Sequence, residues 1–116
     1  MKTSVNNFRL KGFVGNEPEI TNLENASKLV TLRIATNENY TDKNGEKKTI
    51  TDWHSVTLWN SVAEYAEKNV KKGSLVIVEG RIKPRSYENK EGQKAYTIDF
   101  VVDQLDIILT VKEEKE

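Results

Sequence analysis

Hydrophobic and polar residues alternate along most of this chain with the period of two that is typical of β-strands. The alternation is clearest in residues 51–59, where two tryptophans share one face with small hydroxyl side chains. The even face carries His54, Val56 and Leu58, and the odd face carries Trp53, Ser55, Thr57 and Trp59. The two indoles stand roughly 20 Å apart at the rise of a strand. Large rings among small polar residues indicate an exposed platform; the alternative is a strand buried on both sides, with the tryptophans as packing residues.

The same alternation predicts most of the remaining elements as strands. In the first strand, Gly12 and Gly15 indicate a bend or a close approach of two backbones. Pro84 has no N–H to donate, so its end of a strand must lie at a sheet edge or beyond the sheet. The predicted strands are residues 8–14, 28–36, 51–59, 74–87 and 96–102, with a last apolar segment at 103–111 that has a bulge near 103–106.

Two turn signals predict projecting β-hairpins. Asn44-Gly45 is a strong hairpin signal, and it places a long hairpin over residues 35–51. Residues 89–92 have the composition of a second turn. Tyr40 lies on the first hairpin without apolar neighbours at strand spacing, so it is a candidate contact residue; a surface tyrosine that covers the base of the hairpin is the alternative.

One segment has the period of a helix instead. Ser61 and Glu64 match a capping box, and a short amphipathic helix is predicted from there to about Lys72, with Gly73 as its C-terminal cap. The predicted apolar stripe of this helix is Val62, Tyr65, Ala66 and Val70. We expect the helix to plug the end of a barrel.

Composition limits the possible classes of protein. The chain has 116 residues, which suits one domain, and it has no cysteine and a single histidine. No apolar run approaches the ~20 residues of a membrane span, and no secretory signal is visible, so we expect a cytoplasmic protein. Lysine plus arginine and aspartate plus glutamate are equal at 18 each, so a case for nucleic-acid binding must come from where the charges lie.

The cations gather around the second hairpin. Residues 81–94 contain five cations and two acids. A solvated face is the ordinary explanation of such a run, but Tyr87 falls on the same strand face as the cations, which favours a path for a charged polymer. The candidate phosphate contacts along the exposed faces are Arg9, Lys11, Arg33, Arg81, Lys83 and Arg85.

Catalysis finds little support in the sequence. It contains no nucleophile motif, no second histidine and no glycine-rich phosphate loop, so we expect no catalytic residues, no cofactor and no metal site. A small hydrolase would need a pocket with perturbed titrating groups, for which there is no convincing candidate. His54 shares its face with Val56 and Leu58, so we expect a buried or interface histidine that is hydrogen-bonded to a neighbour.

Binding of single-stranded nucleic acid fits the pattern better. Unpaired bases stack on aromatic rings while cations follow the phosphates, and stacking is tolerant of sequence. Duplex readout would need a helix or arm rich in arginine, asparagine and glutamine, which the predicted helix is not. Four rings fall outside the apolar faces and are the candidate stacking residues: Tyr40, Trp53, Trp59 and Tyr87.

Several stretches resemble a known family. The order of elements is similar to that of an oligonucleotide/oligosaccharide-binding (OB) barrel. The amino-acid sequence of several stretches is similar to that of the bacterial single-stranded DNA-binding proteins. The matching stretches are VNNFRLKGFVGNEPE, LRIATNENYTDKNGE, TDWHSVTLWNSVAEYA, VKKGSLVIVEGRIKPRSY and EGQKAY.

The resemblance implies an all-β, five-stranded Greek-key barrel over residues 1–111 and a short charged tail at 112–116. It implies a homotetramer, although a dimer would agree equally with the pattern. It also places His54 at a position that supports the association of subunits in the family. It implies base stacking at the four rings, two of which are tyrosines where the family more often has tryptophan. It also implies a role in DNA replication, recombination and repair, close to the nucleoid.

Two expectations depend on where the resemblance stops. Longer family members end in an acidic tip that recruits enzymes, whereas this sequence ends in VKEEKE, so we expect a short form or the binding domain alone and predict no recruitment through that tip. The alternative function is a primosomal type of OB-fold module, in which protein interaction comes first and nucleic-acid binding is secondary. A binding affinity that falls steeply as the salt concentration rises would indicate phosphate binding rather than an apolar protein interface.

Overall fold

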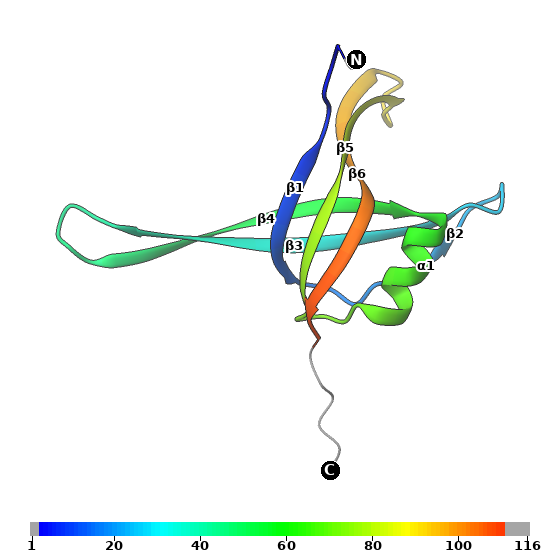
Figure 1. Cartoon of the computed structure of the whole chain (residues 1–116). Helices are drawn as coiled ribbons and strands as arrows, with labels where there is room; N and C mark the ends of the chain where they lie inside the picture. The colour runs from blue at the N-terminus through cyan, green and yellow to red at the C-terminus, as the bar shows by residue number, and fades with distance from the viewer. Residues whose placement is uncertain (1–2, 111–116) are drawn as a thin grey trace.

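The alternating segments form long strands in the computed structural model, which describes residues 3–110. The elements are β1 (Phe8–Val14), β2 (Thr21–Asn22), β3 (Lys28–Thr41), β4 (Lys47–Trp59), α1 (Asn60–Asn69), β5 (Leu75–Glu88) and β6 (Lys94–Leu109) (Figure 1). The sequence pattern did not predict the two-residue β2. The predicted limit of the domain at residue 111 and the charged tail at 112–116 lie outside the described residues.

The strands close into a barrel. Their order in the sheet is β1-β5-β6-β4-β3-β2, and β1 also pairs with β3, where Phe13 lies opposite Ala35 and Val14 opposite Ile34. Neighbouring strands are antiparallel except for β4 and β6, which pair in parallel at Thr57 and Val101. The all-β barrel with one short helix that was predicted from the sequence is confirmed.

The even positions of the central strands fill the barrel. The fully buried side chains of the core include Val30, Leu32, Ile34, Val56, Leu58, Val76 and Val78. Val56 and Leu58 lie on the even face that the period of two assigned to them, and the other core residues follow the same alternation in their own strands. At barrel closure, a Cβ on Gly12 would overlap the carbonyl oxygen of Ala35, so the predicted close approach of two backbones is confirmed.

Helix α1 packs against β3, β4 and β6, with Ala63 and Ala66 in the barrel core, as its predicted plugging role requires. The predicted stripe was partly wrong, because Tyr65 is exposed and Ala63 takes the buried position. Helix α1 is too short to cross a membrane, and the structure shows no longer helix between residues 3 and 110.

The start of the helix differs from the prediction. The capping box at Ser61 and Glu64 was wrong: the N-cap is Trp59, which makes no side-chain capping hydrogen bond. The Glu64 carboxylate instead accepts a hydrogen bond of 2.6 Å from Nζ of Lys28, and this bond lowers the pKa of the Glu64 carboxyl group. The Asn60 side chain also accepts from the backbone N–H of Lys28, at 2.9 Å. The beginning of the helix is therefore fixed by β3 rather than by its own first turn.

The end of the helix also comes earlier than predicted. It ends at Asn69, and the N–H of Val70 donates to the carbonyl oxygen of Ala66. Gly73 is not the helix cap; it has φ +94° in the following turn and donates its N–H to the carbonyl oxygen of Val14 at 2.7 Å. This turn therefore ties the helix exit to β1.

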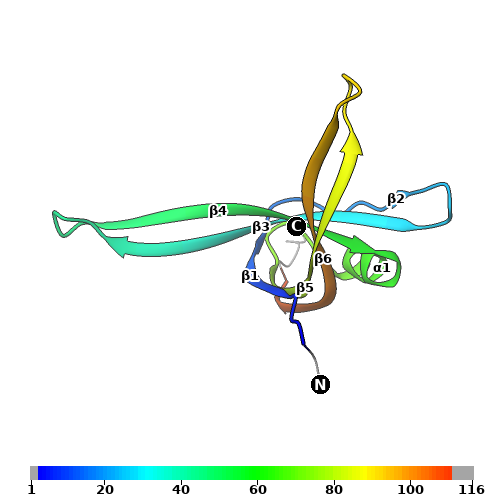
Figure 2. The same ribbon diagram turned by 90° about the horizontal axis from the view of Figure 1, so that it is seen from above.

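Two hairpins project from the barrel in different directions. Figures 1 and 2 show that the β3–β4 hairpin extends well beyond the barrel and that the β5–β6 hairpin leaves it at a large angle to the first. Pro84 lies in the β5–β6 hairpin, where β5 pairs with β6 alone, since the pairing of β1 with β5 ends at Gly80. This placement confirms the predicted edge position of the proline.

The tips of both hairpins use the same turn chemistry. Asp42 and Asn89 each begin a turn, and the side-chain oxygen of each accepts the backbone N–H groups two and four residues later, at 2.9–3.0 Å. Gly45 and Gly92 follow with φ +79° and +77°, which a residue with a Cβ adopts only with strain. Both predicted turns are confirmed.

The predicted bulge in β6 falls at Asp103. Glu79 lies opposite Gln104 and Gly80 opposite Val102, so Asp103 is the extra residue. A Cβ on Gly80 would overlap the carbonyl oxygen of Val101, so glycine permits the tight contact beside the bulge.

Candidate nucleic-acid interface

Trp53 stands on the outer face of the barrel, with half of its surface (52%) exposed. Its strand parity places it with Ala35 across the β3–β4 ladder, opposite the core side chains. The Arg33 guanidinium carbon lies 4.9 Å from the indole centroid, which is a cation–π contact. The ring also lies against Gly15, because a Cβ built there would come within 2.8 Å of Cη2 of the indole.

The backbone next to Gly15 is held to the same strand that carries Arg33. The Gly15 N–H donates to the carbonyl oxygen of Arg33 at 2.8 Å. The Asn16 amide donates to the carbonyl oxygen of Thr31 at 3.0 Å and accepts from the Arg33 N–H at 2.9 Å. The segment that contacts Trp53 is therefore fixed to the β3 backbone by one main-chain and two side-chain hydrogen bonds.

Trp59 is the second ring of the platform, with 38% of its surface exposed. Between the tryptophans, Ser55 is exposed and Thr57 is half-buried. The alternative of a strand buried on both sides was therefore wrong. Trp59 lies at the end of β4 that enters α1, away from the projecting hairpin, so the two indoles mark separate points along one face.

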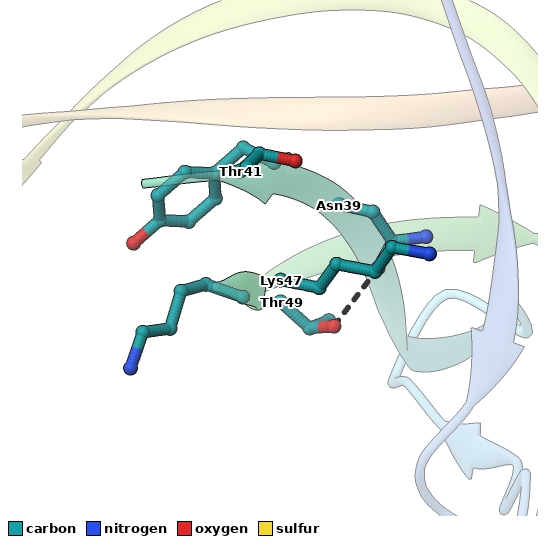
Figure 3. Close-up of a pocket in the computed structure, with 6 residues that line it drawn as sticks. Asn39, Thr41, Lys47 and Thr49 are labelled. Carbon is teal, nitrogen blue, oxygen red and sulfur yellow. Dashed lines mark hydrogen bonds between the residues drawn. The ribbon is translucent and has the colours of Figure 1, made fainter. Parts of the chain in front are cut away.

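Tyr40 is exposed near the far end of the first hairpin, and its register partner is Lys48. Because Tyr40 lies two residues before the turn at Asp42, the alternative of a tyrosine that covers the base of the hairpin was wrong. Register places Tyr40 on the ribbon face opposite to that of Trp53. An open hollow of about 460 Å³ borders Tyr40 and is lined by side chains of the hairpin itself. Figure 3 shows Asn39 and Thr49 joined across this ribbon by a hydrogen bond of 2.8 Å.

Tyr87 is exposed on the second hairpin, in line with the predicted cations. The Arg85 guanidinium carbon lies 5.8 Å from its ring centroid. Arg85 also makes a paired contact with Asp99, through Nε to Oδ2 at 2.7 Å and Nη2 to Oδ1 at 3.2 Å. This hydrogen bond to Asp99 raises the pKa of the Arg85 guanidinium.

The six candidate phosphate contacts fall into two groups. All six are exposed, but three are already in ion pairs. The pairs are Arg9 with Glu79 at 2.9 Å, Arg81 with Asp103 at 3.2 Å and Arg85 with Asp99 at 2.7 Å. Lys11, Arg33 and Lys83 make no ion pair with any carboxylate among residues 3–110, so these three cations are open to a ligand.

His54 is half-buried, and its Nε2 lies 2.9 Å from the Thr36 hydroxyl, which agrees with the predicted hydrogen-bonded histidine. A hollow of about 310 Å³ is bordered by both His54 and Trp53, with Phe8, Ile98 and Phe100 on its apolar side. Ile98 is exposed. The structure thus places the candidate association face directly beside the candidate stacking face.

Among residues 3–110, three exposed rings lie outside the four candidates: Phe13, Tyr65 and Tyr96. Tyr96, on the returning strand, is the most exposed of them, with 75% of its surface exposed. Nζ of Lys94 lies 5.6 Å from its ring centroid. Two signals could have identified it. Lys94, two residues earlier, lies on the same strand face, and both residues lie beyond the barrel, where neither face of the hairpin covers a core.

The candidate residues do not line one pocket, because Tyr40, Trp53 and Tyr87 border three different hollows. The structure brings Arg33 to Trp53 on the barrel and Arg85 to Tyr87 on the β5–β6 hairpin. This hairpin leaves the barrel in a different direction from the β3–β4 hairpin (Figure 2). Within residues 3–110, no group of three or more histidine, cysteine, aspartate or glutamate side chains could hold a metal ion.

Five strands, β1 and β3 to β6, close the barrel around a packed helix, and the two-residue β2 pairs with β3 at the sheet edge. This architecture defines the class of OB-fold proteins. The chain belongs to the single-strand binding protein family, whose model matches residues 5–108. Two proteins named single-stranded DNA-binding protein, from Neisseria meningitidis serogroups A and B, are each 34% identical over 105 residues. These alignments cover 90% of this chain and 60% of each relative, so the chain spans about 60% of the length of these relatives.

Solved structures agree with this assignment. The Plasmodium falciparum SSB complex with ssDNA superposes with a TM-score of 0.75 at 30% identity, over 96% of this chain and 99% of that chain. A deletion mutant of the single-stranded DNA-binding protein from Thermus aquaticus superposes with a TM-score of 0.76 at 24% identity, over 90% of this chain and 50% of that chain. The second likeness shows the fold alone.

Proposed function

We propose that this chain binds single-stranded DNA with little sequence preference and protects it during replication, recombination and repair. The observation that carries the proposal is Trp53, a half-exposed indole that lies against Gly15 and beneath the Arg33 guanidinium, on an open face of the barrel. Family membership and the likeness to a complex with ssDNA support it.

Base stacking supplies the sequence-independent part of the affinity. Tyr40, Trp53, Trp59 and Tyr87 are all exposed, and a stacked base contributes roughly 1–3 kcal/mol per ring. Arg33 covers Trp53 in the free protein, so a base that stacks on that side displaces the guanidinium, which is then free to bind the adjoining phosphate. One movement thus supplies both a stacking contact and a charge contact.

The cations supply the path for the backbone of the strand. Lys11 on β1, Arg33 on β3 and Lys83 on β5 are exposed and unpaired among the described residues. Arg9, Arg81 and Arg85 extend this path when their carboxylate partners are displaced. Because the net charge is zero, attraction to nucleic acid is local to these faces and not a property of the whole surface.

The chain acts as a homo-oligomer without catalysis, cofactor or metal. The hollow beside His54, with the exposed Ile98 on its apolar side, supports association of subunits at this face. A tetramer follows from the family resemblance, and a dimer through this face would satisfy the same observation. The place of action is the cytoplasm, at the nucleoid, where single-stranded DNA arises.

Tryptophan fluorescence during titration with oligo(dT) tests the proposal directly. We expect strong quenching by the single strand, weak response to duplex DNA and partial loss of binding at high salt. The matched variant Trp53→Ala should retain a cooperative thermal transition and lose roughly 1–3 kcal/mol of binding free energy.

Absence of quenching and of binding at low salt would overturn the proposed function. Binding of a protein partner that persists at high salt, without binding of oligo(dT), would support the protein-interaction module instead. Loss of cooperative folding in Trp53→Ala would show that the indole belongs to the core.

A further inference from the structure

Within residues 3–110, Asp99 forms the shorter of the two ion pairs that the cations of the second hairpin make with carboxylates. Its two carboxylate oxygens accept from Nε and Nη2 of Arg85 at 2.7 and 3.2 Å. In the β5–β6 register Asp99 also lies directly opposite Lys83. The carboxylate is therefore between two of the cations that the proposed function assigns to phosphate.

The geometry of this pair is that of a ligand already bound. A planar guanidinium binds a carboxylate and a phosphate through the same two parallel N–H groups, so Arg85 can serve only one of them in this way. Asp99 is the more buried partner, with 27% of its side chain exposed against 54% for Arg85. Arg85 is thus the more accessible partner of the pair.

Arg85 also contacts the adjacent candidate stacking ring. Its guanidinium carbon lies 5.8 Å from the Tyr87 ring centroid, so displacement of Arg85 from Asp99 and stacking of a base on Tyr87 take place at the same point. Arg81 and Asp103 repeat the arrangement four residues away with longer contacts, 3.2 and 3.4 Å.

We propose that Asp99 is an internal competitor of nucleic-acid phosphate, which holds Arg85 in the free protein and must release it before the β5–β6 hairpin binds a strand. The inference rests on the proposed function and adds a residue that sets its affinity and salt dependence. Asp99 lowers the affinity of this hairpin, and so favours release and movement of the strand over tight retention.

The exchange has a thermodynamic signature. When a cation binds a phosphate, a condensed counterion is released from the nucleic acid, which makes binding weaken with salt. When Arg85 leaves Asp99, the uncovered carboxylate attracts a cation from solution, and this uptake offsets the release. The Arg85 contact therefore contributes less to the salt dependence than an unpaired cation does.

The test compares Asp99→Asn with the wild-type full chain in oligo(dT) titrations over a range of salt concentrations. We expect Asp99→Asn to raise affinity about two- to fivefold at low salt, the range of an exposed ion pair. We expect its plot of log affinity against log salt to be steeper by about 0.7. Asp103→Asn should give a smaller gain, because its contacts with Arg81 are longer.

Glu24→Gln is the matched control, since it removes one negative charge from an exposed position outside the ion pairs of the hairpins. It should leave affinity and slope unchanged. A double-mutant cycle with Arg85→Gln separates local exchange from general repulsion: in the Arg85→Gln background, Asp99→Asn should lose most of its gain. Thermal melting of each variant verifies folding.

The outcomes are distinct. Equal or weaker binding by Asp99→Asn would overturn the inference while wild-type binding of oligo(dT) keeps the proposed function. A gain that persists in full without Arg85 would overturn the exchange, because repulsion of phosphate would then explain it. Failure of the wild type to bind would overturn the proposed function and this inference together.

Discussion

At the scale of single residues, the site depends on what surrounds its rings. Trp53 is usable as a platform because Gly15 has no side chain to displace the indole and because Asn16 fixes that backbone to β3. Neither residue would be chosen as a binding residue by its chemistry. Their contribution is to hold the ring at one angle.

The variant Gly15→Ala tests this support. Its Cβ would overlap the indole, so the ring must move, and we expect a loss of part of the roughly 1–3 kcal/mol that a stacked base contributes. Oligo(dT) titration measures the loss, and Gly15→Ala should add nothing in a Trp53→Ala background. Wild-type affinity and fluorescence in Gly15→Ala would show that the ring does not depend on this contact.

The sequence was sufficient to predict which side chains lie on the exposed strand faces, but not which side chains pair with one another. Strand parity identified Trp53, Trp59 and Tyr87 as exposed, because parity is a local property. It did not identify Tyr96, because parity does not reveal where a strand leaves the barrel. The pairing of Arg85 with Asp99 was out of reach, since it depends on the register of two strands.

At the scale of elements, the two hairpins are shaped by their turns. Asn89 holds the second turn through two hydrogen bonds from the N–H groups of Glu91 and Gln93, both at 3.0 Å. The outer part of this hairpin pairs only within itself, so the turn is a main local source of its order.

We expect Asn89→Ala to destabilise the outer hairpin without unfolding the barrel. Each lost hydrogen bond contributes about 0.5–1.5 kcal/mol, and the core residues of the barrel do not contact the turn. Hydrogen exchange should become faster at Tyr87 and Ala95, which face each other in the ladder, and stay slow at Leu32. Equal acceleration at Leu32 would mean that the hairpin and barrel unfold as one unit.

Element prediction was most accurate where turn chemistry is local and least accurate at the helix ends. Ser61 and Glu64 have the spacing of a capping box, but Lys28 of a distant strand binds the Glu64 carboxylate. Gly73 has the left-handed backbone of a cap, yet it serves the next turn. A long-range contact replaced the local one in both cases.

At the scale of the whole molecule, carboxylates paired with half of the candidate cations limit the attraction of the protein to nucleic acid. If all six candidate cations contributed fully, the slope of log affinity against log salt would be about −4 per protomer on a short oligonucleotide. Because Arg9, Arg81 and Arg85 are paired in advance, we expect a slope nearer −2. Titrations at several salt concentrations measure this slope. A slope of −4 or steeper would show that the internal ion pairs do not reduce the salt dependence of binding.

The closure of the barrel has a geometric consequence. Within residues 3–110, β3 with β4 and β5 with β6 form long ladders, the second of them interrupted by bulges. In the same residues, the pairing of β4 with β6 is confined to Thr57 and Val101, and that of β1 with β3 begins and ends with Phe13 and Val14. The barrel is thus closed by short paired segments, by the shared core and by α1, which packs against β3, β4 and β6. Trp53 stands on the β3–β4 ladder and Tyr87 on the outer part of the β5–β6 ladder, so the spacing between these two rings depends on how the two ladders are joined at closure as well as on the course of the second hairpin.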